Sequence, residues 1–378
     1  MGKLSVFSGL DRLSFEPSLL PFLSKSAKIG LITNHTGITK NCTPTHVVLA
    51  ELYTLTSLFA PEHGIRGDRQ AGAAIEEEVD PVTGIPCYSV YGRGRERAHE
   101  VMRTLDAIFF DIQDIGSRYY TYQYAMTDAM QVCAEAGVPF IVLDRPPMLG
   151  TQIEGNLLDP RFASGVGRFP TPTRPGLTIG EFASYINETE RLGCPLTVLP
   201  CGGVLRRIYF DETDCPFVMP SPNLPSVECA LLYVGTCLFE GTNLSEGRGT
   251  TRPFEYIGAP WLRVRPLTEA LNRRRLPGCL FREMYFTPMF SKYAGELCSG
   301  IQIHVYNRAE FRPFETALWM IQFMREQNPE FRFLPGMPHL FGSDEILADD
   351  FDPHLYLADQ GFLLAGYAET VPSYYLYD

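Results

Sequence analysis

Short apolar runs alternate with turn residues and helical patterns along the first half of this chain. The runs lie at residues 29–33, 55–59, 108–111, 140–143 and 196–199. Helical patterns lie at 45–53, 95–105, 120–136 and 178–187. The last of them opens with the capping-box spacing of Thr178 and Glu181. Continuous apolar runs of this length are typical of strands that are buried on both faces. Their alternation with helices predicts βαβ units and a Rossmann-like, doubly wound parallel sheet.

The alternation of predicted strands and helices does not continue in the second half of the chain. A further helix is predicted at 226–239, and mixed α and β signals follow from about Trp261. Because 378 residues exceed what one hydrophobic core usually serves, we expect two domains. The prediction is a Rossmann-like domain at 1–258 and a smaller C-terminal α+β domain at 259–378.

Composition excludes several classes of function. The net charge of -12 gives no support to nucleic-acid binding, which needs a concentrated excess of Lys and Arg. The ten cysteines contain no Cys-x-x-Cys pair, which argues against a structural zinc site. The segment Gly92-Arg93-Gly94-Arg95 has neither the dinucleotide spacing nor the P-loop lysine. We therefore predict no cofactor.

The chain shows no membrane or export signal of its own. Its first residues have neither the apolar core nor the small-residue cleavage site of a signal peptide, and no run of about 18 apolar residues occurs. As written, the chain is expected to be cytoplasmic, and the compartment stays open because a leader is removed from mature proteins.

The first polar cluster follows the run at 55–59. It contains Pro61-Glu62-His63-Gly64 and Arg66, at the expected carboxyl end of a parallel strand. A partly desolvated Glu62 there is a candidate general acid. The alternative is an ordinary loop in which Glu62 pairs with Arg66 and His63 caps a carbonyl.

The second cluster follows the run at 108–111. Asp114 and Arg118 lie in the turn, and Tyr120 and Tyr122 lie at the predicted start of a helix. Helix N-termini favour anions, and an arginine fork suits a carboxylate. Tyrosine faces and hydroxyls are typical of sugar sites, although tyrosines also fill ordinary cores.

The third cluster is the glycine-rich loop at 240–251. It brings Asn243, Glu246 and Arg248 together with several hydroxyls. A functional loop is favoured over an Ω-loop that satisfies its own hydrogen bonds. Asp144, which follows the run at 140–143, forms either a site pair with Arg145 or a structural salt bridge.

These stretches together resemble the NamZ-type exo-β-N-acetylmuramidases, glycoside hydrolases long classed as a domain of unknown function, DUF1343. The resemblance covers most of the chain, and long motifs in the same order are more specific than any single one. Its carriers are Thr33-Asn34-His35-Thr36-Gly37, residues 60–67, residues 111–122, Leu143-Asp144-Arg145-Pro146, residues 221–225 and residues 239–253.

The resemblance implies an activity and a set of roles. It implies hydrolytic release of N-acetylmuramic acid from the non-reducing end of peptidoglycan fragments, by a catalytic Rossmann-like domain with an auxiliary domain. Glycosidases need an acid and a second group. Glu62 is the expected acid, and the second role falls to Glu246, to Asp114, or to the 2-acetamido group of the substrate.

Substrate contacts follow from the same resemblance. The carboxylate of the muramic lactyl group needs a cation, for which the candidates are Arg66, Arg118 and Arg248. The other expected substrate contacts are Asn34, His63, Tyr120, Tyr122, Asp144 and Asn243. Relatives recycle cell-wall sugars and are often secreted or periplasmic, and a homodimer is plausible.

Three departures and two alternatives qualify this interpretation. One departure is the absence of a tryptophan that the family pattern has near Gly203. Pro147 and Pro175 stand where the family pattern has Asn and His, and proline removes both a polar side chain and a backbone donor. One alternative function is a muropeptide-binding protein with weakened catalysis. The other is a metal-dependent hydrolase whose ligands are Glu62, His63, Asp111 and Asp114.

Overall fold

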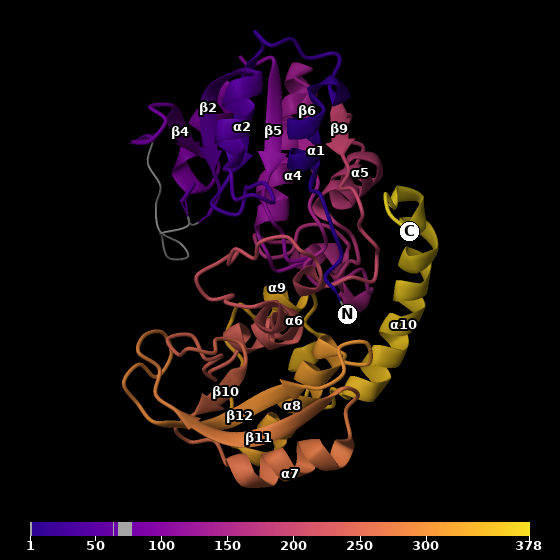
Figure 1. Cartoon of the computed structure of the whole chain (residues 1–378). Helices are drawn as coiled ribbons and strands as arrows, with labels where there is room; N and C mark the ends of the chain where they lie inside the picture. Colours follow the sequence, from indigo (N-terminus) through magenta and orange to yellow (C-terminus); the bar gives the residue numbers. More distant parts are fainter. Residues whose placement is uncertain (1, 63, 67–77) are drawn as a thin grey trace.

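The computed structural model describes residues 2–62, 64–66 and 78–378. Figure 1 shows a parallel sheet flanked by helices in the N-terminal half, and a smaller antiparallel sheet in the C-terminal half. The last long helix, α10 (Pro353–Thr370), runs along the side of both parts and carries the C-terminus back toward α5 (Ile179–Thr189).

The main sheet has seven strands in the order β3-β4-β2-β1-β5-β6-β9. All neighbouring pairs are parallel except β3 and β4, which are antiparallel. The strands are β1 (Lys28–Thr33), β2 (Thr54–Ala60), β3 (Glu78–Val79), β4 (Pro86–Ser89), β5 (Ala107–Asp111), β6 (Phe140–Leu143) and β9 (Leu196–Leu199).

This order confirms the predicted doubly wound α/β fold. Chain order runs outward from β1 through β2 to β4, and then from β5 through β6 to β9 on the other side. The direction of winding therefore reverses between β1 and β5. In open parallel sheets, ligands bind outside the carboxyl ends of the strands at such a reversal.

Helices cover both faces of this sheet. One core cluster joins strand residues such as Phe59 and Phe110 to α3 (Arg95–Met102), α4 (Tyr122–Ala136) and α5. The other joins Leu31 and Phe109 to α1 (Gly9–Phe15) and α2 (Thr45–Leu52). Successive strand residues point to opposite faces, so the adjacent residues Phe109 and Phe110 belong to different clusters.

Local signals explain where the predicted helices begin and end. At α5, the Thr178 hydroxyl accepts from the Glu181 backbone N–H at 3.3 Å, and the Glu181 carboxylate accepts from the Thr178 N–H at 3.0 Å. This is the reciprocal capping box that the sequence predicts. Helix α4 ends at Gly137, whose φ of 67° is left-handed and costs glycine little.

The C-terminal half is built on a three-stranded antiparallel sheet in the order β10-β12-β11. Helices α7 and α8 pack together, and α8 also packs on α6. The strands are β10 (Tyr256–Ala259), β11 (Cys279–Phe286) and β12 (Cys298–Val305). The helices are α6 (Val227–Thr236), α7 (Val264–Arg274), α8 (Pro313–Gln327) and α9 (Met337–Phe341). The domain boundary at 258/259 stays a prediction.

Several smaller features complete the fold. A two-stranded ribbon, β7 (Glu154–Leu157) with β8 (Pro172–Arg174), lies between β6 and β9 in the sequence. All ten cysteines are free thiols. Across the described ranges, no helix is at once long enough and apolar enough to pass through a bilayer.

A buried ion pair joins the ends of β5 and β6. Arg145 Nε donates to Asp111 Oδ1 at 2.5 Å, and its Nη2 donates to Oδ2 at 2.8 Å. Asp111 is fully buried, and Thr45 at the start of α2 also donates to its carboxylate. The planar guanidinium is suited to this two-point contact.

We expect Arg145→Leu to lower the free energy of unfolding by about 3–5 kcal/mol, because it leaves the Asp111 carboxylate buried without its cation. Urea unfolding followed by circular dichroism measures the loss. The control is Arg103→Leu, which removes an exposed pair with Glu135 and is expected to cost no more than about 1 kcal/mol. Equal losses in the two variants would contradict the prediction.

Candidate active site

Glu62 lies in a cavity at the carboxyl edge of the main sheet. The side chain is half-buried, and the Thr121 hydroxyl donates to its Oε2 at 3.0 Å. The cavity, called the Glu62 cavity below, has a volume of about 200 Å³. Its polar and aromatic wall includes Glu62, Tyr91, Arg95, Tyr122, Asp128 and Arg168.

The backbone explains why Glu62 is presented there. Strand β2 ends at Ala60, and the Gly64 N–H closes a turn on the Pro61 carbonyl at 3.1 Å. Gly64 has a φ of 78°, a left-handed value that glycine adopts without strain. Glu62 therefore lies in a tight turn directly beyond the strand. His63, the neighbouring candidate, lies outside the described residues.

One face of α4 forms the opposite wall of the Glu62 cavity. Thr121, Ala125 and Asp128 follow the helical spacing of i, i+4 and i+7, so they share one face. Two arginines contact Asp128. Arg168 donates to its carboxylate, and Arg95 Nη1 lies 3.6 Å from Oδ2.

Tyr122 lines the Glu62 cavity, whereas Tyr120 is a structural neighbour. The hydroxyls of Tyr122 and Tyr120 both donate to the Pro220 carbonyl, at 2.9 and 2.7 Å. Burial raises the pKa of both phenols. The Asn34 side chain faces the Tyr122 hydroxyl and opposes this rise, so Asn34 lies close to the Glu62 cavity.

A second cavity, of about 350 Å³, lies beside the end of β1. Asn34 and Arg66 line it together with His46 and Asp80. Arg66 Nη2 donates to Asp80 Oδ1 at 2.5 Å, so its cation already has a carboxylate partner. Burial lowers the pKa of His46, which favours its neutral form.

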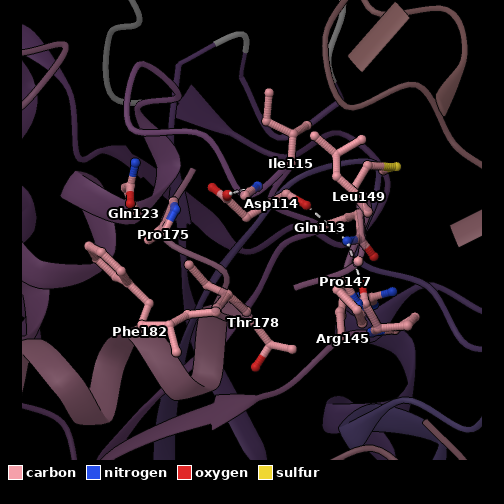
Figure 2. Close-up of a pocket in the computed structure, with 16 residues that line it drawn as sticks. Gln113, Asp114, Ile115, Gln123, Arg145, Pro147, Leu149, Pro175, Thr178 and Phe182 are labelled. Carbon is pink, nitrogen blue, oxygen red and sulfur yellow. Dashed lines mark hydrogen bonds between the residues drawn. The ribbon is translucent and has the colours of Figure 1, made fainter. Parts of the chain in front are cut away.

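Asp114 lies in a third and much smaller cavity, shown in Figure 2. The volume is about 20 Å³, which is room for about one water-sized group. Asp114 Oδ1 accepts from the Gly116 N–H at 2.7 Å, and its Oδ2 has no hydrogen-bond partner among the described residues. Burial raises the pKa of Asp114 to about 7, against the opposing effect of backbone N–H groups.

Both prolines at which we expect a departure from the family pattern fall on this small cavity. Pro147 and Pro175 line it with Asp114 (Figure 2), and neither lines the Glu62 cavity. Gln113 Oε1, from the same wall, also lacks a hydrogen-bond partner within the described chain. Any effect of these two prolines is therefore expected on the surroundings of Asp114 and not on the wall of the Glu62 cavity.

Arg118 and Asp144 belong to the framework of the protein. Arg118 is fully buried and donates to the carbonyls of Asn156, Thr171 and Phe341. The Asp144 carboxylate accepts from Thr178, the Gly180 N–H and Tyr377, and burial raises its pKa to about 6. The structure does not bring either residue to the Glu62 cavity.

The third polar cluster forms an ion network in the C-terminal half. Glu246 is buried and pairs with Lys292 at 3.1 Å and with Arg248 at 3.4 Å, while Arg248 also pairs with Glu240 at 2.5 Å. Burial raises the pKa of Glu246, and Lys292 opposes the rise. No described contact joins this network to Glu62.

Asn243 serves the same part of the fold. Its side chain accepts from the Arg332 N–H at 2.8 Å and donates to the Glu330 carbonyl at 2.9 Å. These bonds tie the predicted loop to the segment after α8. Asn243, Glu246 and Arg248 thus lie together, as the sequence predicts, but away from the Glu62 cavity.

Three charged residues of the Glu62 cavity are not among the site residues predicted from the sequence. Arg95, Asp128 and Arg168 come from α3, from the middle of α4 and from the loop before β8. One signal was available, because Asp128 is an acidic residue seven positions after Thr121 on a mostly apolar helix. Arg168 had no comparable local signal.

The geometry also bears on the metal alternative. Arg145 and Thr45 occupy the Asp111 carboxylate, so it is not available as a ligand. Over residues 2–62, 64–66 and 78–378, no group of three His, Cys, Asp or Glu side chains is close enough to hold a metal ion.

Comparison with protein families and curated proteins gives consistent matches. A family model described as exo-beta-N-acetylmuramidase NamZ, N-terminal, matches residues 29–228, and its C-terminal counterpart matches residues 231–377. The peptidoglycan beta-N-acetylmuramidase NamZ of Bacillus subtilis is 46% identical over 339 residues. The match covers 88% of this chain and 80% of that protein.

Two crystal structures of DUF1343 family proteins from Bacteroides fragilis have the same fold. One superimposes with a TM-score of 0.88 at 29% identity and covers all of both chains. The other has a TM-score of 0.79 at 26% identity and covers 99% of each chain.

The raised pKa of Asp114 predicts a pH-dependent stability difference. Between pH 3.8 and about 7, the folded protein keeps a proton on Asp114 that the unfolded chain has lost. Stability relative to Asp114→Asn should therefore fall as pH rises through this window, by up to about 1.4 kcal/mol per pH unit, and level off above it. Urea unfolding from pH 4 to 8.5 measures the difference, and a constant difference would contradict the prediction.

Proposed function

This chain belongs to the NamZ family of exo-β-N-acetylmuramidases, and we propose that it releases terminal N-acetylmuramic acid from peptidoglycan fragments with Glu62 as the general acid. The assignment of Glu62 rests on its position, because the side chain is half-buried in a cavity at the carboxyl end of β2. Thr121 orients the carboxyl group through one oxygen. A positioned carboxyl group is what protonation of a glycosidic oxygen requires.

The size and wall of the Glu62 cavity support exo action. A volume of about 200 Å³ is below the 300–1,000 Å³ typical of pockets for larger ligands. The space suits one terminal sugar better than an internal stretch of glycan. Tyr91 and Tyr122 provide aromatic faces beside Glu62, as sugar sites commonly do.

The second catalytic role goes, in this proposal, to the 2-acetamido group of the substrate. Among the described residues that line the Glu62 cavity, Asp128 is the other carboxylate, and two arginines neutralise it. Asp114 lies in a cavity too small for a sugar, and Glu246 lies in the ion network with Lys292. The predicted nucleophile roles of Asp114 and Glu246 remain predictions without support from their placement.

Two further expectations remain proposals. A homodimer is one of them, and light scattering on the purified protein tests it. The other is a binding protein with weakened catalysis, for which tight muropeptide binding without product is the diagnostic result.

We expect Glu62→Gln to lower kcat on a chromogenic β-N-acetylmuramide by about 10²–10⁴-fold, because the amide has no proton to donate to the leaving oxygen. Thermal unfolding should stay unchanged. Glu100→Gln, on the exposed face of α3, is the matched control and should keep full activity. If Glu62→Gln retained normal turnover while folded, the assignment of the acid would be wrong.

Participation of the acetamido group makes a separate prediction. Replacing the 2-acetamido group by 2-trifluoroacetamido withdraws electrons from the attacking oxygen, so kcat should fall by roughly tenfold or more if that oxygen attacks in the transition state. The measurement compares the two substrates with the same leaving group. Equal rates would instead favour attack by a protein carboxylate or by water.

A further inference from the structure

We infer that Arg95 and Arg168 form the site that binds the lactyl carboxylate of N-acetylmuramic acid and so distinguishes it from N-acetylglucosamine. The inference rests on the proposed function, because it identifies how that cavity recognises its substrate. It replaces three arginines predicted from the sequence with two that line the same cavity as Glu62.

The two arginines reach the cavity from different elements. Arg95 begins α3, and Arg168 lies in the loop before β8. Both turn toward Asp128 on α4, with Arg168 donating to the carboxylate and Arg95 Nη1 lying 3.6 Å from Oδ2. The Arg168 guanidinium also lies over the Tyr124 ring, 5.3 Å from its centroid. Asp128 and Tyr124 therefore hold the guanidinium groups in place without covering them.

The group formed by Arg95, Arg168 and Asp128 has one more cation than it has anions. Two cations share one carboxylate, which leaves a net charge of +1 for this group of three side chains. Each guanidinium has five N–H donors in a planar fork, more than one carboxylate accepts. A second carboxylate, supplied by the substrate, would balance the charge and accept the remaining donors.

The other candidate arginines are placed differently. Arg118 is fully buried and donates to three backbone carbonyls. Arg248 pairs with Glu240 and Glu246 in the C-terminal half, and Arg66 pairs with Asp80 in the neighbouring cavity. None of the three lines the Glu62 cavity.

Selectivity between the two sugars follows from the charge that each brings to the two arginines. N-acetylglucosamine differs from N-acetylmuramic acid by the absence of the lactyl ether, so it brings no anion. A site built to bind a charged group loses that interaction when the group is missing. Loss of the charge-assisted hydrogen bonds that one arginine makes to the lactyl carboxylate should lower kcat/KM by about 10- to 100-fold.

The experiment compares Arg95→Gln and Arg168→Gln with wild type on two substrates that share a leaving group. One is the β-N-acetylmuramide, and the other is the same compound with its lactyl carboxylate converted to a neutral amide. Arg103→Gln is the matched control, because Arg103 also joins α3 to α4 through an ion pair, with Glu135, but lies outside the cavity.

We expect each cavity variant to lose about 10- to 100-fold in kcat/KM on the acid, mainly through KM, and less than about threefold on the amide. Wild type and Arg103→Gln should both prefer the acid. Equal losses on both substrates, or no loss on the acid, would overturn the inference.

A binding measurement separates this inference from the proposed function. Calorimetry of free N-acetylmuramic acid against N-acetylglucosamine, with wild type and Arg168→Gln, requires no turnover. If wild type cleaves neither substrate but prefers the acid through Arg168, the proposed activity fails and the binding site stands. If wild type cleaves the muramide but Arg168→Gln binds both sugars like wild type, the inference fails and the activity stands.

Discussion

The buried pair between Asp111 and Arg145 fixes the edge of the sheet on which the site is built. It joins the ends of β5 and β6, and Thr45 and the Ile38 carbonyl bind the same two side chains from the β1–α2 side. Strands on both sides of the reversal in winding are therefore held at their carboxyl ends. Every cavity at this edge depends on that alignment, because each is lined by residues that directly follow a strand.

Most of the polar residues that the sequence predicts for the site bind other groups of the protein and stabilise the fold. Fewer of them face a cavity. Arg118, Asp144 and Arg248 are buried or paired with partners inside the protein. Unpaired buried charges are costly, so each of these residues needs those partners to be stable. A functional side chain differs in that part of its hydrogen-bonding capacity faces an open cavity. Glu62, Arg95 and Arg168 meet that condition in one place.

The sequence predicted what depends on local patterns. The five runs became β1, β2, β5, β6 and β9, and the capping box at Thr178 correctly placed the start of α5. Strand β4 is not predicted because Pro86-Cys87-Tyr88-Ser89 begins with proline and ends with serine and so does not form a continuous apolar run. Arg168 was missed because its partner Asp128 is 40 residues away, and only packing of the loop on α4 brings them together. Glu62 was predictable because a strand end fixes its position locally.

In the proposed function, recognition of the substrate depends on the charges that line the Glu62 cavity. Arg95, Arg168 and the Asp128 carboxylate that they share carry a net charge of +1 as a group. A lactyl carboxylate brings this net charge to zero. A neutral sugar instead covers a cation whose charge no anion of this group balances, and the cation loses part of its hydration. In the proposed function, selectivity for the acidic sugar therefore arises from the charge that the substrate carboxylate adds to these three side chains.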